Sequence, residues 1–508
     1  MEKTNALVIG AGIGGIATAI RLAQQGYRAN VFEKCERAGG RCNIIEKDGH
    51  RFDTGPTLFL LPELYRQAFA DLGESIENHL DMIRIDPTYQ IHFDDGSDLQ
   101  LTSDLNGMQA QLEGFETGSF GQYLKYLTEG QRNYASALPN VVNRPFDHWY
   151  EFFTLKNLFL MLRLNALVKH YKHIGKYFQD DRLKVAFTFQ NMYMGINPSQ
   201  APAIFSLMQY AEMADGIWYP KGGMYSIIEA LMKIAHKWGI QFYFNTPVEK
   251  IKIEGNQVTG VTLEDGREIQ SDLVIANADL PYVYNQLLPD SGYAKQLEKK
   301  KYGCSALVFF WGLDKQFSQL GPHNLFIAND FKESFDALFD GRTVADDPSF
   351  YIHAPVRVDP SLAPDGQETL MVAAPIGHLT EDDSQDWGVI KTQVRKRVLE
   401  RLAKEGISNV ENHIKFEICL TPQYWKNRLN LTKGSAHGLS HALLQMGYMR
   451  PHNKHRKYQN LYFVGASTHP GTGLPTVLVS AKLVSERILR DAGKPVVSRI
   501  PALAVAQS

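Results

Sequence analysis

The sequence predicts an α/β fold in which a Rossmann-like dinucleotide-binding domain is built from both ends of the chain. The first observation is the glycine pattern Gly10-Ala11-Gly12-Ile13-Gly14-Gly15, which directly follows a short apolar run at residues 5–9. The second is a glycine-rich turn at residues 465–473, between an apolar run at residues 461–464 and a helix start near Leu474. Such turns are typical of nucleotide sites, because a helix start presents unpaired backbone N–H groups.

The N-terminal glycine pattern lies inside a complete strand–helix–strand pattern. Residues 5–9 are typical of a short buried strand, residues 16–25 are helical by composition, and residues 27–32 form the second strand. Gly26 occupies the position that closes the helix. Because all three elements are in place, the pattern predicts a dinucleotide site. The alternative is a tight turn in some other α/β protein.

Each glycine of the pattern has an expected role. Gly10 permits the tight turn, Gly12 lets the backbone approach a pyrophosphate, and Gly15 allows the helix to pack closely on the strand. Gly14 belongs to the same turn. Glu33 ends the second strand, where its carboxylate can accept hydrogen bonds from ribose hydroxyls. Since that carboxylate would repel a 2′-phosphate, it argues against NADP.

The C-terminal segment, residues 460–475, carries a resemblance to a known family. It resembles the signature of the bacterial and fungal phytoene dehydrogenases, the acyclic carotenoid desaturases, without departure. That signature continues to a small residue six positions after Leu474, and Ser480 occupies this position. The wider resemblance covers nearly the whole chain and is closest to the diapophytoene and phytoene types. It implies a two-dinucleotide-binding flavoprotein fold with FAD.

The resemblance also implies which residues contact FAD. Gly39-Gly40-Arg41 matches the loop that lies along the pyrophosphate and the ribityl chain in such flavoproteins. The planar fork of Arg41 suits a phosphate group, whereas the alternative is a solvated surface arginine. By motif position, Val248 contacts the adenine and Asp279 lies near the diphosphate, although an ordinary core strand and turn would also explain them. Gly55-Pro56-Thr57 resembles the segment that passes close to the isoalloxazine ring.

The C-terminal turn is expected to face the flavin ring. The positive end of the helix dipole would stabilise a flavin that becomes anionic on accepting a hydride. FAD is expected to be bound non-covalently, since no cysteine or histidine stands in a known attachment context. The residues of this turn that we expect to bind the cofactor are Gly465, Ala466, Gly471, Thr472, Gly473 and Leu474.

The chain is expected to enter the FAD-binding domain three times. Residues 1–70, 222–285 and 455–495 build this domain, and residues 71–221 and 286–454 build a substrate-binding lobe. The lobe is expected to combine a mixed sheet, which floors a cavity, with a helical part that could face a membrane. Residues 497–508 read as a loose tail.

Composition limits the remaining classes. The net charge of −2 leaves no electrostatic footprint for nucleic acid. The four cysteines have no C-x-x-C spacing, so that neither a metal site nor a disulfide framework is expected and a reducing, cytoplasmic setting is predicted. The N-terminus runs directly into the first strand instead of a leader, and no apolar window is long enough to span a bilayer.

Residues 146–178 combine aromatic and leucine side chains with a basic end. Such a helix suits a membrane interface, whereas a plain amphipathic helix covering the substrate lobe explains the same pattern. The substrate implied by the resemblance favours the first interpretation, because a long polyene is almost insoluble in water. Peripheral attachment to a membrane surface is therefore expected.

The expected reaction introduces C=C bonds into an acyclic C30 or C40 isoprenoid. Oxidised flavin N5 takes a hydride, and a water or a carboxylate takes the proton, since the allylic positive charge is delocalised. Quinone or oxygen then serves as electron acceptor. The pattern identifies no catalytic base, and neither His469 nor Glu151 is a strong candidate.

Two other functions stay open at this point. The same fold could host a carotenoid oxygenase, a ketolase or isomerase, or another flavin oxidase such as an amine oxidase. GDP-dissociation inhibitors share the fold and bind prenyl chains without redox chemistry, but the two intact glycine turns disfavour that class. Substrate length, the number of desaturation steps and the oligomeric state do not follow from the sequence.

Overall fold

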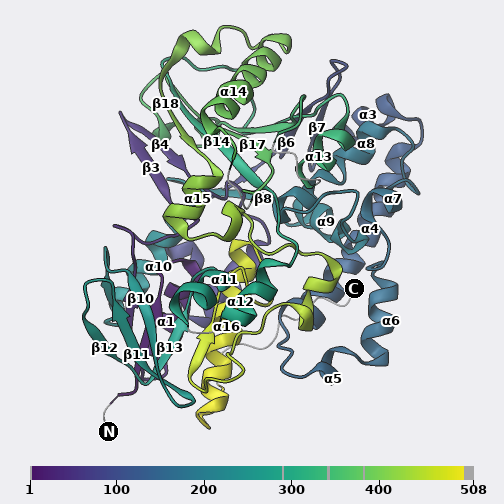
Figure 1. The fold of residues 1–508 in the computed structure, drawn as a ribbon. Helices are drawn as coiled ribbons and strands as arrows, with labels where there is room; N and C mark the ends of the chain where they lie inside the picture. Colours follow the sequence, from purple (N-terminus) through teal and green to yellow (C-terminus); the bar gives the residue numbers. More distant parts are fainter. Residues whose placement is uncertain (1–2, 289–290, 340–343, 381–383, 497–508) are drawn as a thin grey trace.

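The computed structural model describes residues 3–288, 291–339, 344–380 and 384–496 (Figure 1). The predicted tail at residues 497–508 lies outside this range. The described chain forms one part that contains the predicted dinucleotide site, here called the nucleotide-binding part, and a second part built on a larger sheet (Figure 1). No described helix is both long and apolar enough to cross a membrane.

A five-stranded parallel sheet forms the centre of the nucleotide-binding part. Its central strands are almost wholly buried, as expected for a parallel sheet with both faces covered. Three long helices, α1, α10 and α16, accompany it, and α1 packs against both of the others. In sheet order the strands are β19 (Leu461–Phe463), β13 (Leu273–Ala276), β1 (Asn5–Ile9), β2 (Arg28–Phe32) and β9 (Gln241–Tyr243), and the helices are α1 (Ile13–Gln24), α10 (Ser226–Lys237) and α16 (Leu474–Asp491).

A three-stranded antiparallel sheet packs beside it and shares a core with β1 and β13. Its strands are β10 (Val248–Glu254), β11 (Gln257–Leu263) and β12 (Glu268–Gln270). The turn between β11 and β12 contains Gly266 in the left-handed region, with φ of 84°. A hairpin therefore turns at this glycine.

A seven-stranded mixed sheet forms the second part, and α14 (Trp387–Lys404) covers one of its faces (Figure 1). The strand pairs are antiparallel apart from the parallel pair of β15 and β6. In sheet order the strands are β18 (Ile414–Leu420), β14 (Ser305–Leu313), β17 (Glu368–Ile376), β16 (Phe350–His353), β15 (His323–Phe326), β6 (Tyr89–His92) and β7 (Asp98–Leu101).

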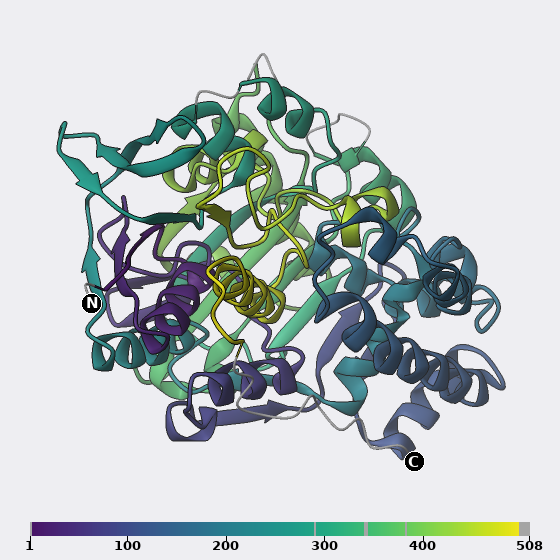
Figure 2. The same cartoon turned by 90° about the horizontal axis from the view of Figure 1, so that it is seen from below.

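Helices gather on one side of this sheet (Figures 1 and 2). Helices α4 and α9 pack together there. The helices of this group are α3 (Leu105–Phe115), α4 (Ser119–Ala137), α5 (Trp149–Phe152), α6 (Leu155–Arg163), α7 (His170–Ile174), α8 (Asp181–Ala186) and α9 (Ser206–Ala214).

Shorter elements connect these parts. The two-stranded ribbons are β3 (Ile44–Lys47) with β4 (His50–Asp53) and β5 (Met82–Ile85) with β8 (Ile217–Pro220). The remaining helices are α2 (Pro62–Asp71), α11 (Leu280–Tyr282), α12 (Ser291–Glu298), α13 (Phe331–Phe339) and α15 (Pro422–Leu429).

The aromatic region at residues 146–178 differs from the single helix that its composition suggested. It contains three short helices, α5, α6 and α7. Thr154 separates the first two, because its Oγ1 accepts a hydrogen bond from the N–H of Asn157 and thereby caps α6. Asn165, with a positive φ of 52°, follows the end of α6. Local capping therefore divides residues 146–178 into separate helices, although their hydrophobicity alone predicts one continuous helix.

Candidate functional site

The N-terminal glycine turn stands at the carboxyl end of β1, where α1 begins. Gly10 has a φ of 96°, which only glycine adopts readily, and its N–H donates to the carbonyl of Phe32 at 2.8 Å. Gly12 is the N-cap of α1, and no side chain caps this helix start. The predicted Gly39 loop lies against the turn, since the Gly39 N–H donates to the Ala11 carbonyl at 2.8 Å. Both loops expected at the pyrophosphate are thus adjacent.

Two glycines of the turn allow close packing. A Cβ on Gly15 would stand 2.2 Å from the Gly10 carbonyl oxygen and 3.2 Å from Val8, so only a hydrogen fits between helix and strand. A Cβ on Gly14 would stand 2.8 Å from Val477 of α16. Gly14 therefore brings the C-terminal helix against α1, and the two helices pack directly on each other (Figure 1).

Glu33 is a buried carboxylate behind the glycine turn. One oxygen accepts a hydrogen bond from the Ala11 N–H at 2.7 Å, and the other accepts from the Cys35 N–H at 2.9 Å. The sequence predicted ribose hydroxyls as its partners. A carboxylate has about four acceptor sites, so both backbone bonds leave capacity for a ribose. In this structure its contacts hold the turn in shape.

Arg41 lies half-buried beside the predicted FAD loops. Its guanidinium donates to the Ala436 carbonyl at 3.2 Å, and within the described ranges no carboxylate forms an ion pair with it. Burial lowers the pKa of Arg41, and the charge of Asp279 partly opposes this effect. A cation held in this way fits the diphosphate of a dinucleotide, which supplies the missing counter-charge. Arg41 is not the freely solvated arginine of the alternative interpretation.

Asp279 joins two loops at the same end of the sheet. One of its oxygens accepts from the hydroxyl of Thr432 at 2.6 Å and from the Thr432 N–H at 3.0 Å. The other accepts from the hydroxyl of Ser467 at 2.7 Å, within the C-terminal turn. The aspartate thus anchors the turn. Val248, the other residue predicted by motif position, is the first residue of β10 and is buried.

Gly55 explains how the Gly55-Pro56-Thr57 segment approaches the Arg41 loop. A Cβ on Gly55 would stand 1.9 Å from the Arg41 carbonyl oxygen, so no larger residue fits. The hydroxyl of Thr57 then bonds the phenol oxygen of Tyr351, on β16, at 2.8 Å. The segment therefore links the nucleotide loops to the seven-stranded sheet.

The C-terminal turn has the form that its sequence predicted. Gly465, Gly471 and Gly473 all have φ near 120–140°, and α16 starts at Leu474 without a capping side chain. Ser480 is fully buried and accepts a hydrogen bond from the Gly465 N–H at 3.4 Å, which accounts for a small polar residue there. The helix start that faces the turn supplies a positive potential.

A histidine side chain holds the backbone of this turn. The Thr472 N–H donates to Nε2 of His441 at 3.1 Å. The Thr472 hydroxyl donates to the His437 carbonyl at 2.8 Å. A Cβ on Gly471 would stand 2.1 Å from the same His441 nitrogen. His441 therefore shapes the turn. Its contacts with residues 471 and 472 join segments that are distant in the sequence, so no local pattern predicts them.

No sequence pattern marked Arg450, whose guanidinium bonds the carbonyls of the same turn. Its guanidinium is 1% exposed and donates only to backbone carbonyls, among them Ala466 at 2.6 Å and Thr468 at 3.1 Å. The other acceptors are the carbonyls of Leu439, Ser440 and Gln445. Burial and the charge of Arg41 lower the pKa of Arg450 to about 9, so it stays cationic at neutral pH. No carboxylate of the described segments pairs with Arg450, and such a positive charge favours negative charge on a bound cofactor.

The two weak catalytic candidates have structural contacts. Nε2 of His469 bonds the Arg144 carbonyl at 2.9 Å, its ring packs edge-on against Phe146, and burial lowers its pKa to about 4. Glu151 accepts hydrogen bonds from the N–H groups of Asp147 and His148 and caps α5. Both residues shape their loops.

A buried polar chain runs from the Thr57 segment along the sheet toward α9. The phenol oxygen of Tyr351 bonds His323 at 2.6 Å, and the His323 ring lies beside Tyr89. The hydroxyl of Tyr89 in turn contacts that of Tyr193. This chain ends at a buried carboxyl group on α9.

That carboxyl group belongs to Glu212, which the sequence did not reveal. It is 1% exposed, accepts from Nε2 of Gln190 at 3.1 Å, and is hydrogen-bonded by Tyr193. Burial raises its pKa to about 8, so it is protonated at neutral pH and can exchange a proton there. An acidic residue in a predicted helix is usually exposed, so the sequence does not predict the complete burial of Glu212.

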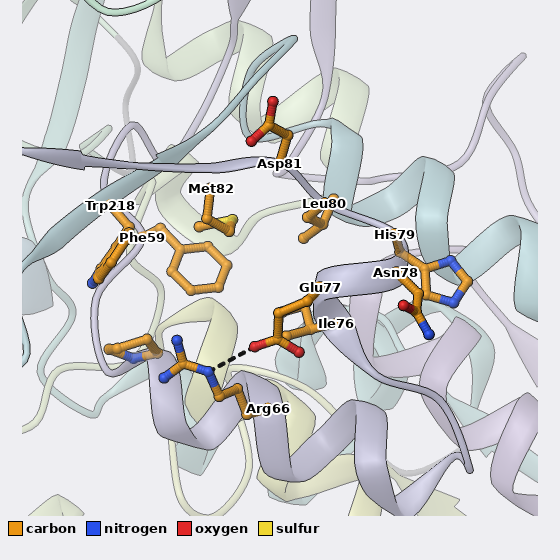
Figure 3. Close-up of a pocket in the computed structure, with 11 residues that line it drawn as sticks. Phe59, Arg66, Ile76, Glu77, Asn78, His79, Leu80, Asp81, Met82 and Trp218 are labelled. Atoms are coloured by element: carbon orange, nitrogen blue, oxygen red, sulfur yellow. Dashed lines mark hydrogen bonds and ion pairs between the residues drawn. The ribbon is translucent and has the colours of Figure 1, made fainter.

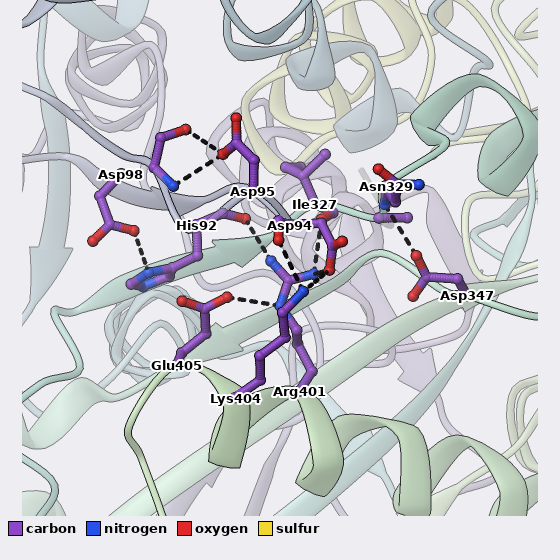
Figure 4. A network of polar contacts seen from close by, with 12 residues as sticks. His92, Asp94, Asp95, Asp98, Ile327, Asn329, Asp347, Arg401, Lys404 and Glu405 are labelled. Atoms are coloured by element: carbon purple, nitrogen blue, oxygen red, sulfur yellow. Dashed lines mark hydrogen bonds and ion pairs between the residues drawn. The ribbon is translucent and has the colours of Figure 1, made fainter.

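Two further features lie away from the glycine turns. A cavity of about 610 Å³ opens between α2 and β5, where Phe59, Trp218 and the Arg66–Glu77 ion pair line it (Figure 3). His92, Asp98 and Glu405 come close enough to hold a metal ion (Figure 4). However, His92 pairs with Asp98 at 2.7 Å, and Arg401 forms an ion pair with Glu405 at 2.9 Å. These pairs explain why the three side chains lie together without a metal ion.

Comparison with known proteins identifies flavin-dependent oxidoreductases and carotenoid desaturases as similar to this chain. A family model described as flavin containing amine oxidoreductase matches residues 13–489. The zeta-carotene-forming phytoene desaturase of Myxococcus xanthus is 42% identical over 98% of this chain and 96% of the relative. The 4,4'-diapophytoene desaturase (4,4'-diaponeurosporene-forming) of Staphylococcus haemolyticus is 34% identical over 95% and 98%, respectively. A solved oxidoreductase of Methanosarcina mazei has a TM-score of 0.64 at 16% identity, over 95% of this chain and all of that one, which concerns the fold alone.

Proposed function

The chain belongs to the flavin-containing amine oxidoreductase family and is an FAD-dependent carotenoid desaturase, and we propose that its substrate is an acyclic C30 or C40 isoprenoid. The resemblance drawn from residues 460–475 is thereby confirmed. The observation that carries the proposal is the sequence similarity to both a phytoene and a diapophytoene desaturase. The identities are 42% and 34%, and the matches cover nearly the full length of the chain. The two intact glycine turns, packed together through Gly14, support it.

In this proposal the chain's own residues hold and polarise the cofactor. The glycine turn and Arg41 bind the diphosphate, while the start of α16 and the Arg450 cation give the C-terminal turn a positive potential. Bound FAD supplies the hydride acceptor, N5. The proton from the neighbouring carbon passes to water or to a carboxylate, since the allylic charge needs no strong base. Quinone or oxygen accepts the electrons.

Expression beside a polyene synthase tests the substrate. The gene is expressed with a C30 synthase in one strain and with a C40 synthase in another, and the pigments are separated by chromatography. We expect a colourless precursor to give coloured products, with longer-wavelength absorption for each added double bond. Oxygenated products without a gain in conjugation would replace desaturation by the oxygenase alternative.

We further propose that the protein attaches peripherally to a membrane through α5, α6 and the residues around them. Large apolar side chains are exposed here, where a cover over the substrate lobe would bury them. The exposed set comprises Trp149, Tyr150, Phe153, Leu155, Leu158, Phe159, Leu162 and Leu167, with exposed fractions from 50% to 76%. Each such side chain buried in lipid contributes about 1.5–3 kcal/mol, so a few suffice for reversible attachment.

Replacing Leu155, Phe159 and Leu162 together by serine should weaken binding to liposomes by at least about tenfold, because three apolar contacts are lost. Liposome co-sedimentation measures this effect. Phe152 is unsuitable for the test, since it packs into the fold against Gly447. As a matched control, Leu105, Trp238 and Val389 are exposed apolar residues on other elements, and serine there should leave binding unchanged. Equal loss in both variants would refute a localised membrane surface.

A further inference from the structure

A second cavity, of about 500 Å³, lies between α12 and the segment at residues 444–456. Five basic side chains line it, and none of its lining residues carries a carboxylate. These basic residues are Lys299, Lys300, Arg450, His452 and Arg456. The cavity is therefore a concentration of positive charge in a chain whose net charge is −2.

Three of the cations that line the cavity form no ion pair among the described residues. Within the described ranges, no carboxylate pairs with Lys299, Lys300 or Arg456, whereas the neighbouring Lys454 pairs with Asp491 at 2.8 Å. Burial and the charge of Arg450 lower the pKa of Lys300. The N–H groups of Arg450 donate to backbone carbonyls, so this residue contributes positive charge to the cavity but no hydrogen-bond donors. An anion in the cavity would relieve this repulsion.

The rim of the cavity is apolar. Phe153 and Leu444 line it and are 57% and 73% exposed. The Phe153 ring packs edge-on against Tyr448, and α5 packs on the turn that contains Gly447, where a Cβ would meet the Phe152 ring at 2.3 Å. The cavity is thus continuous with the exposed apolar surface of α5 and α6. Charge inside and apolar side chains at the rim match the two ends of one lipid molecule.

We propose that this cavity binds the phosphate headgroup of an anionic phospholipid, held by Lys299, Lys300 and Arg456, while Phe153 and Leu444 contact its acyl chains. The inference rests on the membrane attachment proposed above and adds a specific lipid to it. Arg450 lines the cavity and also bonds Ala466 and Thr468 of the flavin turn. A bound lipid therefore sets the bilayer one side chain away from the turn that faces the cofactor.

The test compares vesicles of phosphatidylcholine alone with vesicles that also contain phosphatidylglycerol. The FAD-loaded protein is co-sedimented with each, as wild type and as the combined variant Lys299→Ser, Lys300→Ser and Arg456→Ser. We expect wild type to prefer the anionic vesicles by about 100-fold, since each cation near an anionic surface contributes about fivefold. The variant should lose that preference, keep its binding to neutral vesicles and keep its FAD.

A second variant separates the cavity from diffuse attraction. Lys169, Lys172 and Lys176 are exposed beside the same apolar helices, outside the cavity, and their replacement by serine removes the same charge. An equal loss of preference in this variant would overturn the proposal, as would binding of soluble glycerol phosphate as tight as that of the vesicles. If wild type binds neither kind of vesicle, the membrane attachment itself fails. If it binds both kinds equally, only the headgroup site fails.

Discussion

Gly12→Val is expected to yield a folded protein that retains less than about a tenth of the wild-type FAD, a loss of at least the 1.4 kcal/mol that tenfold weaker binding represents. The φ and ψ of Gly12, −72° and 168°, suit valine, so the backbone is not strained. However, a Cβ at this position stands 2.7 Å from the amide nitrogen of Asn277. The branched side chain would therefore displace the Asn277 side chain and fill the space beside the Gly39 loop that we propose for the pyrophosphate.

The measurement is the flavin-to-protein absorbance ratio after gel filtration, with circular dichroism as the test of folding. Gly121→Val is the matched control, because a Cβ on Gly121 in α4 meets nothing within 4 Å. That variant should keep its full flavin content. A Gly12→Val protein with normal FAD would show that this turn does not bind the dinucleotide.

Thr472→Pro is expected to lower the rate of desaturation by at least about 100-fold, the typical cost of disturbing a preorganised polar site. Proline removes the N–H that bonds His441 and restrains the backbone between two glycines of positive φ. The turn before α16 would therefore move, although the N-terminal glycine turn, which we propose to bind the diphosphate, stays intact.

Product formation per unit time, measured at equal FAD content, checks this prediction. Thr472→Ser is the control, since serine keeps both the N–H to His441 and a hydroxyl for the His437 carbonyl. We expect the serine variant to retain most of the activity. Wild-type rates in the proline variant would mean that this turn does not shape the reacting face of the cofactor.

Local patterns predicted the nucleotide-binding part well, because its signals are local. The strand at residues 5–9 and the helix start at Leu474 occur as expected. Helix α1 begins at Ile13, earlier than residue 16, because Gly12 already serves as its N-cap. Apolar runs, glycines of positive φ and helix starts are properties of a few neighbouring residues, and a sequence displays them directly.

The residues that were missed depend on contacts between distant segments. Arg450 bonds carbonyls up to 18 positions away, and no pattern distinguishes it from a surface arginine. Glu212 has an ordinary helical neighbourhood, and its burial depends on tertiary contacts, among them those with Gln190 and Tyr193. Likewise, Thr432, which bonds Asp279, and the two histidines that bond Thr472 come from the segment at residues 432–441, which no motif connects to the cofactor. The sequence thus predicted the two glycine turns but not the distant side chains that pack against them.

The central claim is that this chain passes a hydride from a saturated carbon pair to its FAD, and an anaerobic single turnover tests it most directly. The purified, FAD-loaded protein is mixed without oxygen or quinone with the acyclic precursor in liposomes, and flavin bleaching and products are measured together. We predict one new double bond for each FAD reduced, with further steps only after an acceptor is added. Unbleached flavin with unchanged substrate, or a product that carries oxygen on later exposure to O₂ without added conjugation, would contradict the account.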